Sequence, residues 1–174
     1  MNKALPKILL GIVLACSLFF GFLYANNDIG KTANSLEADI RLSQKISDDW
    51  NVDGSISDTM AAFISYPQAK TDHTFSIYVN RPGLSFGYFF RGGGDIVEVD
   101  EYIAEFVVEG YNERAFISMN TQNVVRLEIG DGNNVRVIDI DSGKPFAIVL
   151  PLNAENICFY NTNGTVVEYL RQPL

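Results

Sequence analysis

Four acidic residues crowd one short stretch of the chain, and Glu105 follows soon after. The four are Asp95, Glu98, Asp100 and Glu101. Paired carboxylates can serve as general acid and general base when burial pushes their pKa values apart. This spacing supports one functional hypothesis, a hydrolase that acts on cell-envelope material through the acidic residues near 95–105. The same residues also fit the solvated rim of a β-strand, and that interpretation is preferred.

His73 is the only histidine of the chain and lies in a polar turn, 71–74. A single histidine excludes a metal site built on a histidine pair, and no serine or thiol motif stands beside it as a nucleophile. The segment 139–143 places two acids at i and i+2, as calcium loops do, but no bidentate glutamate follows at the right distance. The sequence therefore predicts no catalytic residue, no metal site and no cofactor, and an enzyme is the less favoured class.

The segment 85–94 carries aromatic side chains on both faces of a predicted strand, more than one buried face can hold. Alternate residues are expected to fill the core, namely Leu84, Phe86, Tyr88 and Phe90. Phe89 and Arg91 then lie on the opposite face, beside a mobile loop of three glycines. Aromatic and arginine side chains are enriched at binding hot spots. The predicted contacts for a protein or envelope ligand are Phe89, Arg91, Gly92, Gly93 and Gly94.

This contact surface has a competing explanation. The helix predicted over 29–50 could cover the same face of the sheet, and the glycines could simply turn the chain. Phe89 would then belong to the core rather than to a binding surface.

Apolar and polar residues alternate with period two through most of the chain after residue 51, which is typical of half-buried strands. The predicted strands are 60–66, 75–79, 84–90, 104–109, 115–119, 125–129, 135–140, 146–152, 157–160 and 165–170. Turns recur every 8–12 residues or so, which leaves no room for crossover helices. Residues 51–174 are therefore expected to form one mainly β domain, an antiparallel β-sandwich or a barrel-like fold. The strand 146–152 is apolar on both faces, which predicts a central position.

Residues 29–50 favour an amphipathic helix. Ala33, Leu36 and Ile40 recur at helical spacing, and charged residues occupy the other faces. Asp and Asn residues over 48–54 end this helix and open a turn. The segment 26–50 is thus expected to be a juxtamembrane helix whose apolar stripe docks on the β domain.

An uncharged apolar run, 8–24, follows Lys3 and Lys7. Its 17 residues would form a helix about 26 Å long, at the short end of what spans a bilayer. The positive-inside rule places the N-terminus in the cytoplasm and everything from about residue 26 outside it. Residues 1–25 are therefore predicted to be a transmembrane signal anchor, with the membrane contacted through 8–24.

Two other fates of the apolar run stay open. Cleavage after Ala25 would secrete the domain, although the small residue preferred two places earlier is missing. The residues 13–16, VLAC, resemble a lipobox, in which Cys16 would be lipidated. Against lipidation, the eight residues after Cys16 are apolar, whereas a lipoprotein normally continues into a polar tether.

Acidic residues dominate outside the apolar run. Setting Lys3 and Lys7 aside leaves 11 of the 13 Lys and Arg residues against all 21 Asp and Glu residues, a net charge of −10. Such a domain repels phosphate backbones, which argues against a nucleic-acid partner. Topology and composition together favour a membrane-anchored extracytoplasmic β domain with a non-enzymatic binding or accessory role at the cell envelope.

Overall fold

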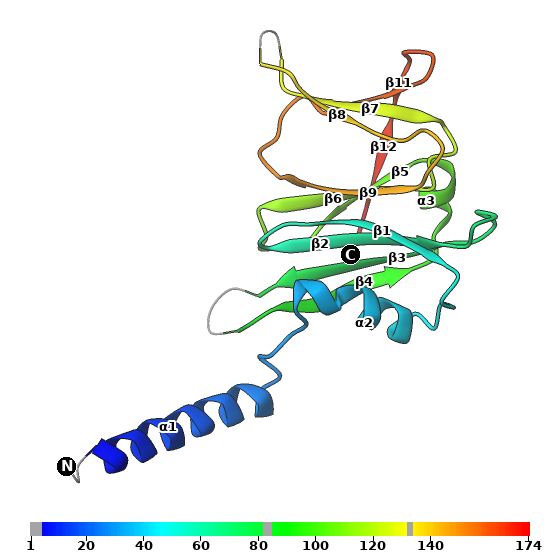
Figure 1. Cartoon of the computed structure of the whole chain (residues 1–174). Helices are drawn as coiled ribbons and strands as arrows, with labels where there is room; N and C mark the ends of the chain where they lie inside the picture. The colour runs from blue at the N-terminus through cyan, green and yellow to red at the C-terminus, as the bar shows by residue number, and fades with distance from the viewer. Residues whose placement is uncertain (1–4, 82–84, 132–133) are drawn as a thin grey trace.

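The computed structural model describes residues 5–81, 85–131 and 134–174. Its β domain consists of three four-stranded sheets stacked face to face (Figure 1). The first sheet has the order β1-β2-β3-β4, with bounds Asn51–Ile56, Met60–Tyr66, Thr74–Asn80 and Tyr88–Gly94. The middle sheet has the order β12-β5-β6-β9, with bounds Tyr169–Gln172, Ile103–Val107, Glu113–Ser118 and Phe146–Pro151. The third sheet has the order β11-β10-β7-β8, with bounds Val166–Val167, Cys158–Asn161, Val124–Ile129 and Arg136–Asp139.

Antiparallel pairing joins neighbouring strands in all three sheets, apart from β5 and β12, which run parallel. The mainly β fold class is therefore confirmed. Within the described residues the sheets remain open and no barrel closes, so the sandwich is the correct choice of the two predicted architectures.

The middle sheet is buried on both faces because its strands are apolar on both. Ala104, Phe106 and Ile117 face the first sheet and pack in one core with side chains such as Ile64 and Ile77. On the opposite face a second core joins residues of the middle and third sheets, among them Ile103, Phe116, Leu127 and Phe159. Successive residues of β5 and β6 thus point into different cores, as the pleat requires.

The strand β9 differs from its predicted place at the centre of a sheet. It forms the edge of the middle sheet beyond β6, while β5 and β6 are the central strands. Its two apolar faces still have an explanation. Val149 packs against the first core and Ile148 against the second, because β9 lies in the layer between them.

The second helix, α2 (Leu36–Ser43), covers the outer face of the first sheet. Leu36 and Ile40 are fully buried against Ala61, Phe63 and Tyr78. The helix is much shorter than the predicted 29–50, although a 3-10 turn, η1 (Ala33–Ser35), extends it at the N-terminal side. The docking of its apolar stripe on the β domain is confirmed.

Two backbone features limit α2: Lys31 pairs with Tyr88 ahead of it, and Lys45, directly after its C-cap, has a left-handed φ of 56°. The segment 51–56, where the sequence predicts a turn, pairs along its whole length with β2 and becomes β1. Gly54 fits there because the Phe63 ring occupies the place of a Cβ atom. The polar residues of this segment do not predict a strand from the sequence. They are tolerated because β1 lies at one edge of its sheet and is partly exposed.

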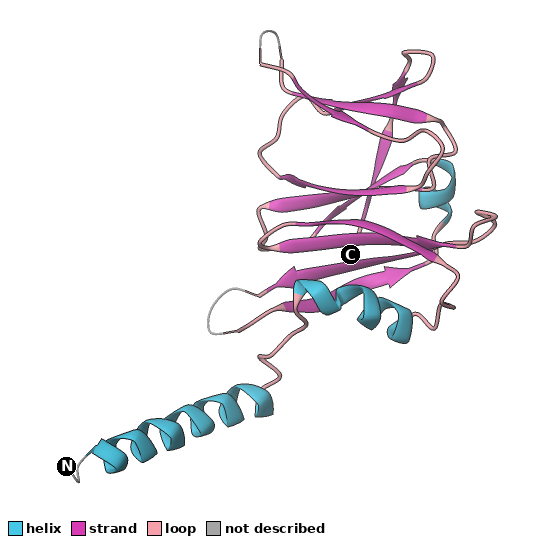
Figure 2. Cartoon of the chain, viewed as in Figure 1, coloured by secondary structure: helices cyan, strands magenta, loops and turns pink. Residues whose placement is uncertain are grey.

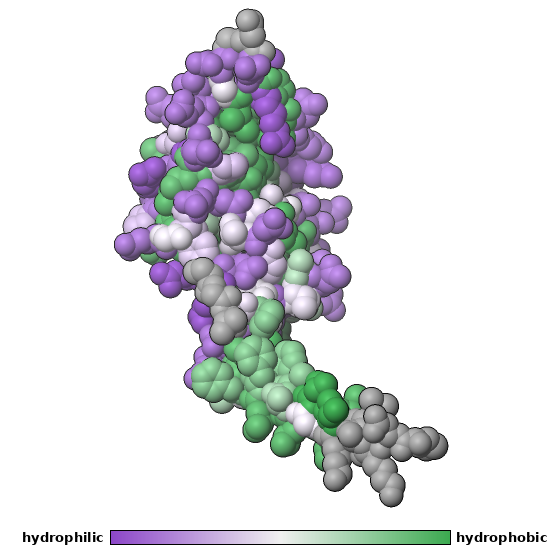
Figure 3. Space-filling model, turned by 90° about the vertical axis from the view of Figure 1, so that its left-hand side faces the viewer, coloured by the Kyte–Doolittle hydropathy of each residue, from purple (hydrophilic) through white to green (hydrophobic). Residues whose placement is uncertain are grey.

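The N-terminal helix, α1 (Leu5–Ala25), extends away from the β domain (Figure 2). Its window Ile8–Ala25 is long and apolar enough to cross a membrane, and only 6% of that window is buried. Figure 3 shows its apolar surface beside a domain whose visible face is largely hydrophilic. Such a helix fits a membrane anchor or a signal sequence.

A well-defined cap ends α1. The Asp28 N–H donates to the Leu23 carbonyl at 2.9 Å, and the Asn27 N–H donates to the Tyr24 carbonyl at 3.1 Å. Asn27 has a left-handed backbone, with φ of 55°. These two bonds and this conformation define a Schellman motif, which turns the chain sharply out of the helix.

The chain after this cap pairs directly with the segment leading into β4. Gly30 and Lys31 donate to the carbonyls of Phe86 and Tyr88 at 2.6 and 2.8 Å, and the amides of Phe86 and Tyr88 donate back to Asp28 and Lys31 at 2.9 and 2.7 Å. A methyl group on Gly30 would lie 2.6 Å from the Tyr88 carbonyl oxygen, and one on Gly87 would lie 2.5 Å from the Lys31 carbonyl oxygen. We refer to this paired segment, 28–31 with 86–88, as the junction.

The close approach at the junction can be tested with a matched pair of glycines. Gly87 and Gly110 have nearly the same left-handed φ, +86° and +84°, but only Gly110 has open space where a Cβ would lie. Either change to alanine should cost about 1 kcal/mol for the backbone conformation. We expect Gly87→Ala to cost more and to lower hydrogen-exchange protection of the Lys31 and Tyr88 amides, which Gly110→Ala leaves intact. Equal protection in the two variants would contradict the close approach.

Candidate functional site

The predicted contact residues lie on β4, at the edge of the first sheet, but the predicted faces are reversed. Phe89 is paired with Val79, whose side chain is in the first core, so Phe89 lies on the core side. Tyr88 instead packs with the side chains under α2, and the Phe90 ring meets Tyr78 edge-on at 5.5 Å. The register is imposed by β3, which the sequence of β4 alone does not reveal. Leu84 lies outside the described residues.

The expected core residues of this segment are also more exposed than predicted. Phe86 and Phe90 are 51% and 50% exposed, whereas Phe89 is half-buried. The prediction that Phe89 lies opposite the core is therefore wrong.

The glycines 92–94 form the paired end of β4, and the prediction that they make a mobile loop or a turn is wrong. Gly92, Gly93 and Gly94 pair in register with Ile77, Ser76 and Phe75. A side chain at Gly92 would collide with that of Leu174, and a Cβ on Gly93 would lie 2.5 Å from the Phe75 carbonyl oxygen. The glycines therefore permit close packing and offer no contact side chain.

Arg91 occupies a β-bulge. Ile77 pairs with Gly92 and Tyr78 with Phe90, so Arg91 is the extra residue between them. The Arg81 guanidinium carbon lies 4.1 Å from the centroid of the Phe89 ring. A hollow of about 160 Å³, here named the arginine hollow, is lined by Val79, Arg81, Phe89, Phe90, Arg91 and Tyr111. A hollow lined by two arginines, one of them over an aromatic ring, suits a carboxylate or another anionic group.

Two further hollows adjoin the arginine hollow along the same end of the sheets. One, of about 370 Å³, shares Arg81 and Tyr111 with it and also includes Thr59 and Asn112. These last two residues also line a larger hollow, of about 960 Å³, formed by 57–59, 112–113 and 151–153. There the hydroxyls of Ser57 and Thr59 both donate to Glu113.

This continuous surface could not be read from the sequence. Its residues come from the strands β3 and β4 and from separate turns, where Ser, Thr and Asn have ordinary backbone roles. Only the stacking of the first and middle sheets brings these turns together. In Figure 1 they lie at the end of the sheets that faces α1.

The acidic stretch divides between two places. Glu105 is 2% exposed and faces the second core, where its carboxylate accepts from Arg114 Nη1 at 2.8 Å and from Arg171 Nε at 3.1 Å. Both of its oxygens are thus engaged by arginines, which is the geometry of a structural ion pair rather than of a free acid or base.

The other acids surround the short helix α3 (Val97–Glu101), which the sequence reading missed. Val99 is buried in the first core and fixes this turn of helix. Asp95 precedes α3 and Asp100 belongs to it, and their carboxylates lie 3.6 and 3.0 Å from His73 Nε2 and Nδ1. Local sequence patterns do not predict this cluster, because His73 and the two aspartates are far apart in the chain and meet only in the folded domain.

Cys16, the candidate for lipidation, lies within α1 with its side chain exposed. Cys158 lies in β10 of the third sheet. Lipidation of Cys16 stays a prediction.

The ion pair at Glu105 predicts a large effect on stability. Glu105→Gln removes the negative charge that balances buried Arg114, and it should lower the free energy of unfolding by about 3–5 kcal/mol. Glu101→Gln, at an exposed position nearby, should stay within about 0.5 kcal/mol of the wild type. Chemical denaturation monitored by circular dichroism measures both. A Glu105→Gln protein as stable as the Glu101→Gln protein would show that the ion pair is dispensable.

No known protein family matches this chain, and no curated protein or solved structure shows significant similarity to it.

Proposed function

We propose that this chain is a membrane-anchored extracytoplasmic β domain with a non-enzymatic binding role at the cell envelope. The observation that carries the proposal is the junction. Four backbone hydrogen bonds and a Schellman cap connect α1 to the first sheet without a flexible linker. With α1 in a bilayer, this connection holds the domain close to the membrane surface. Lys3 and Lys7, ahead of the apolar run 8–24, favour the orientation with the domain outside.

The partner surface in this proposal is the end of the sheets that faces α1. It combines the arginine hollow with the two larger hollows beside it. Arg81 and Arg91 are exposed cations in a domain of strong negative charge, so a carboxylate of the partner would be attracted to the arginine hollow, whereas the hollow of about 960 Å³ carries Asp58 and Glu113. A membrane-associated protein that presents a carboxylate-rich segment near the bilayer fits both the charge and the location.

A hydrolase built on the acidic residues near 95–105 has less support. Glu105 is buried and committed to two arginines, so it is not available as a free acid or base. A binding role needs only the hollows themselves and no free catalytic acid or base.

Photo-cross-linking tests this partner surface in living cells. A photoreactive residue at exposed Asn112, which lines two of the hollows, should give a discrete adduct, whereas one at Asn163 in the turn before β11 should not. Arg91→Glu should abolish the adduct at position 112 without lowering the melting temperature, because Arg91 is exposed on a bulge.

Arg136→Glu is the matched control, since Arg136 is also an exposed arginine but lies on β8 of the third sheet. An adduct that survives Arg91→Glu, or that Arg136→Glu abolishes equally, would place the partner elsewhere.

The orientation is tested by cysteine labelling. In intact cells or spheroplasts, a membrane-impermeant maleimide should modify Asn163→Cys, while Asn2→Cys, ahead of α1 in the chain, should react only after lysis. The unsubstituted chain provides the background from Cys16 and Cys158. The reverse pattern would invert the topology. The mass of the mature protein decides between a retained anchor and cleavage after Ala25.

A further inference from the structure

We propose that His73 and Asp95 form a binding site for a divalent transition-metal ion such as Zn²⁺, with Asp100 as the residue that orients the imidazole. This site lies at the other end of the sheets from the partner surface and does not depend on it. The sequence argument excluded a metal site built on two histidines. One histidine combined with carboxylates from another part of the chain is a different donor set.

The fold holds these three residues in place from separate elements. His73 precedes β3, and its backbone N–H donates to the Asp72 carboxylate at 2.8 Å. Asp100 belongs to α3, where the Val99 carbonyl accepts from the Met119 amide at 2.8 Å. The Thr121 hydroxyl donates to the Asp100 carbonyl at 2.7 Å. The site is therefore assembled by tertiary structure rather than by one flexible loop.

The His73 imidazole has one satisfied and one unsatisfied nitrogen. Its Nδ1 lies 3.0 Å from Asp100 Oδ1, so an Nδ1–H donates to that carboxylate and leaves the lone pair on Nε2. His73 is only 2% exposed, and its Nε2 is buried without a hydrogen-bond partner among the described residues. Buried polar atoms are nearly always paired, so this nitrogen requires an explanation.

The direction of Nε2 supplies the explanation. It faces Asp95 Oδ1 at 3.6 Å, and the donor atoms of His73, Asp95 and Asp100 all lie within 4.8 Å of one another. Two ligand atoms on one tetrahedral Zn²⁺ are about 3.3 Å apart, given bonds of about 2.0–2.1 Å. An ion between Nε2 and Asp95 would therefore need only a small adjustment of an exposed aspartate. A carboxylate that accepts the other N–H of a ligating histidine is the usual orienting partner.

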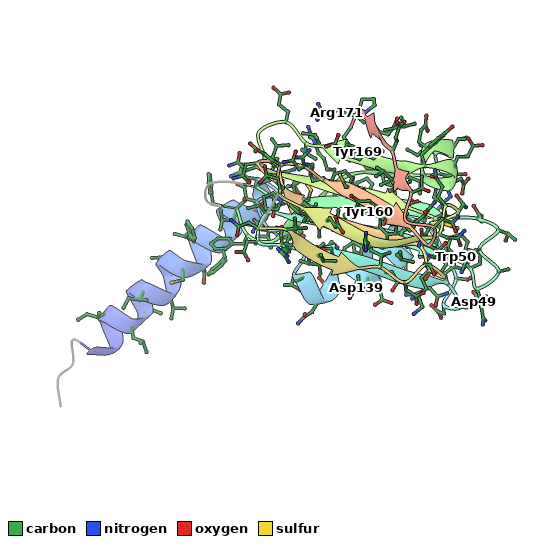
Figure 4. All side chains as sticks on the ribbon, turned by 90° about the horizontal axis from the view of Figure 1, so that it is seen from above. Asp49, Trp50, Asp139, Tyr160, Tyr169 and Arg171 are labelled. Carbon is green, nitrogen blue, oxygen red and sulfur yellow. The ribbon has the colours of Figure 1, made fainter. Side chains whose placement is uncertain are left out.

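The surroundings admit a hydrated cation. His73 and Asp95 line a hollow of about 470 Å³ together with Gln44, Trp50 and Asp72. Figure 4 shows Trp50 and Asp49 at the end of the molecule opposite α1, which places this hollow away from the junction. Acidic side chains dominate the charge around this hollow. They are Asp72, Asp95 and Asp100, against one lining cation in the described part of the chain, Lys45. An imidazole ligand favours a transition metal over Ca²⁺ or Mg²⁺, which prefer oxygen donors.

Zn²⁺ titration of the full chain tests the site, in detergent micelles, without a histidine tag and after treatment with a chelator. Calorimetry should show one equivalent bound. Because His73 is the only histidine, its imidazole proton resonances report the site alone and should shift in step with the heat. Asp95→Asn should weaken binding at least about tenfold by removing a ligand, and Asp100→Asn by about 10–100-fold by releasing the imidazole.

Asp139→Asn, at an exposed position on β8, should bind like the wild type and controls for general acidity. Asp95 is exposed, so loss of binding in Asp95→Asn with an unchanged melting temperature separates a ligand from a structural residue. The proposal fails if millimolar Zn²⁺ leaves the imidazole resonances unmoved. It also fails if Asp95→Asn binds like the wild type, because Asp95 would then not be a ligand.

Discussion

The burial of both faces of the middle sheet is the constraint on which the rest of the structure depends. β5 and β6 carry apolar side chains toward both neighbours, so they can exist only between two other sheets. The buried acid of β5, Glu105, shows how strongly this environment disfavours an unpaired charge. Glu105 faces the second core and requires Arg114 from β6 and Arg171 from β12 to neutralise it. The parallel strand β12 therefore supplies a counter-charge as well as an edge.

The stack of sheets gives the domain two ends with different chemistry. The strand β3 connects them, since it begins just after His73 and ends just before Arg81. Seven residues in an extended strand span about 20 Å or slightly more. The arginine hollow and the His73 cluster are thus separated by a rigid element. A substitution at either end can be interpreted without direct interference from the other, because sites this far apart usually behave additively.

The sequence predicts where the strands lie, but it does not predict which strands and layers lie next to one another. Period-two alternation is a local property and predicts Thr74–Asn80 close to its observed limits, while the β-forming residues ahead of Pro67 predict Met60–Tyr66. The sequence does not predict three layers of sheet, because Glu105 makes β5 resemble a strand with one solvated face. The pairing of β4 with β3 places Phe89 on the core side and Phe90 beside Tyr78, which the alternation within β4 alone does not reveal. His73, Asp95 and Asp100 meet only through tertiary packing, which local patterns do not encode.

The junction also covers part of an exposed sheet edge. β4 is the outermost strand of the first sheet, and an open edge invites pairing with other chains. Residues 28–31 cover the approach to this strand, and the Arg91 bulge interrupts the regular edge farther along. Bulges of this kind hinder edge-to-edge association while leaving side chains accessible. The segment that leads out of α1 therefore protects the same strand whose side chains line the arginine hollow. Tethering and edge protection are thus combined in one short piece of backbone, which accounts for glycine at both Gly30 and Gly87.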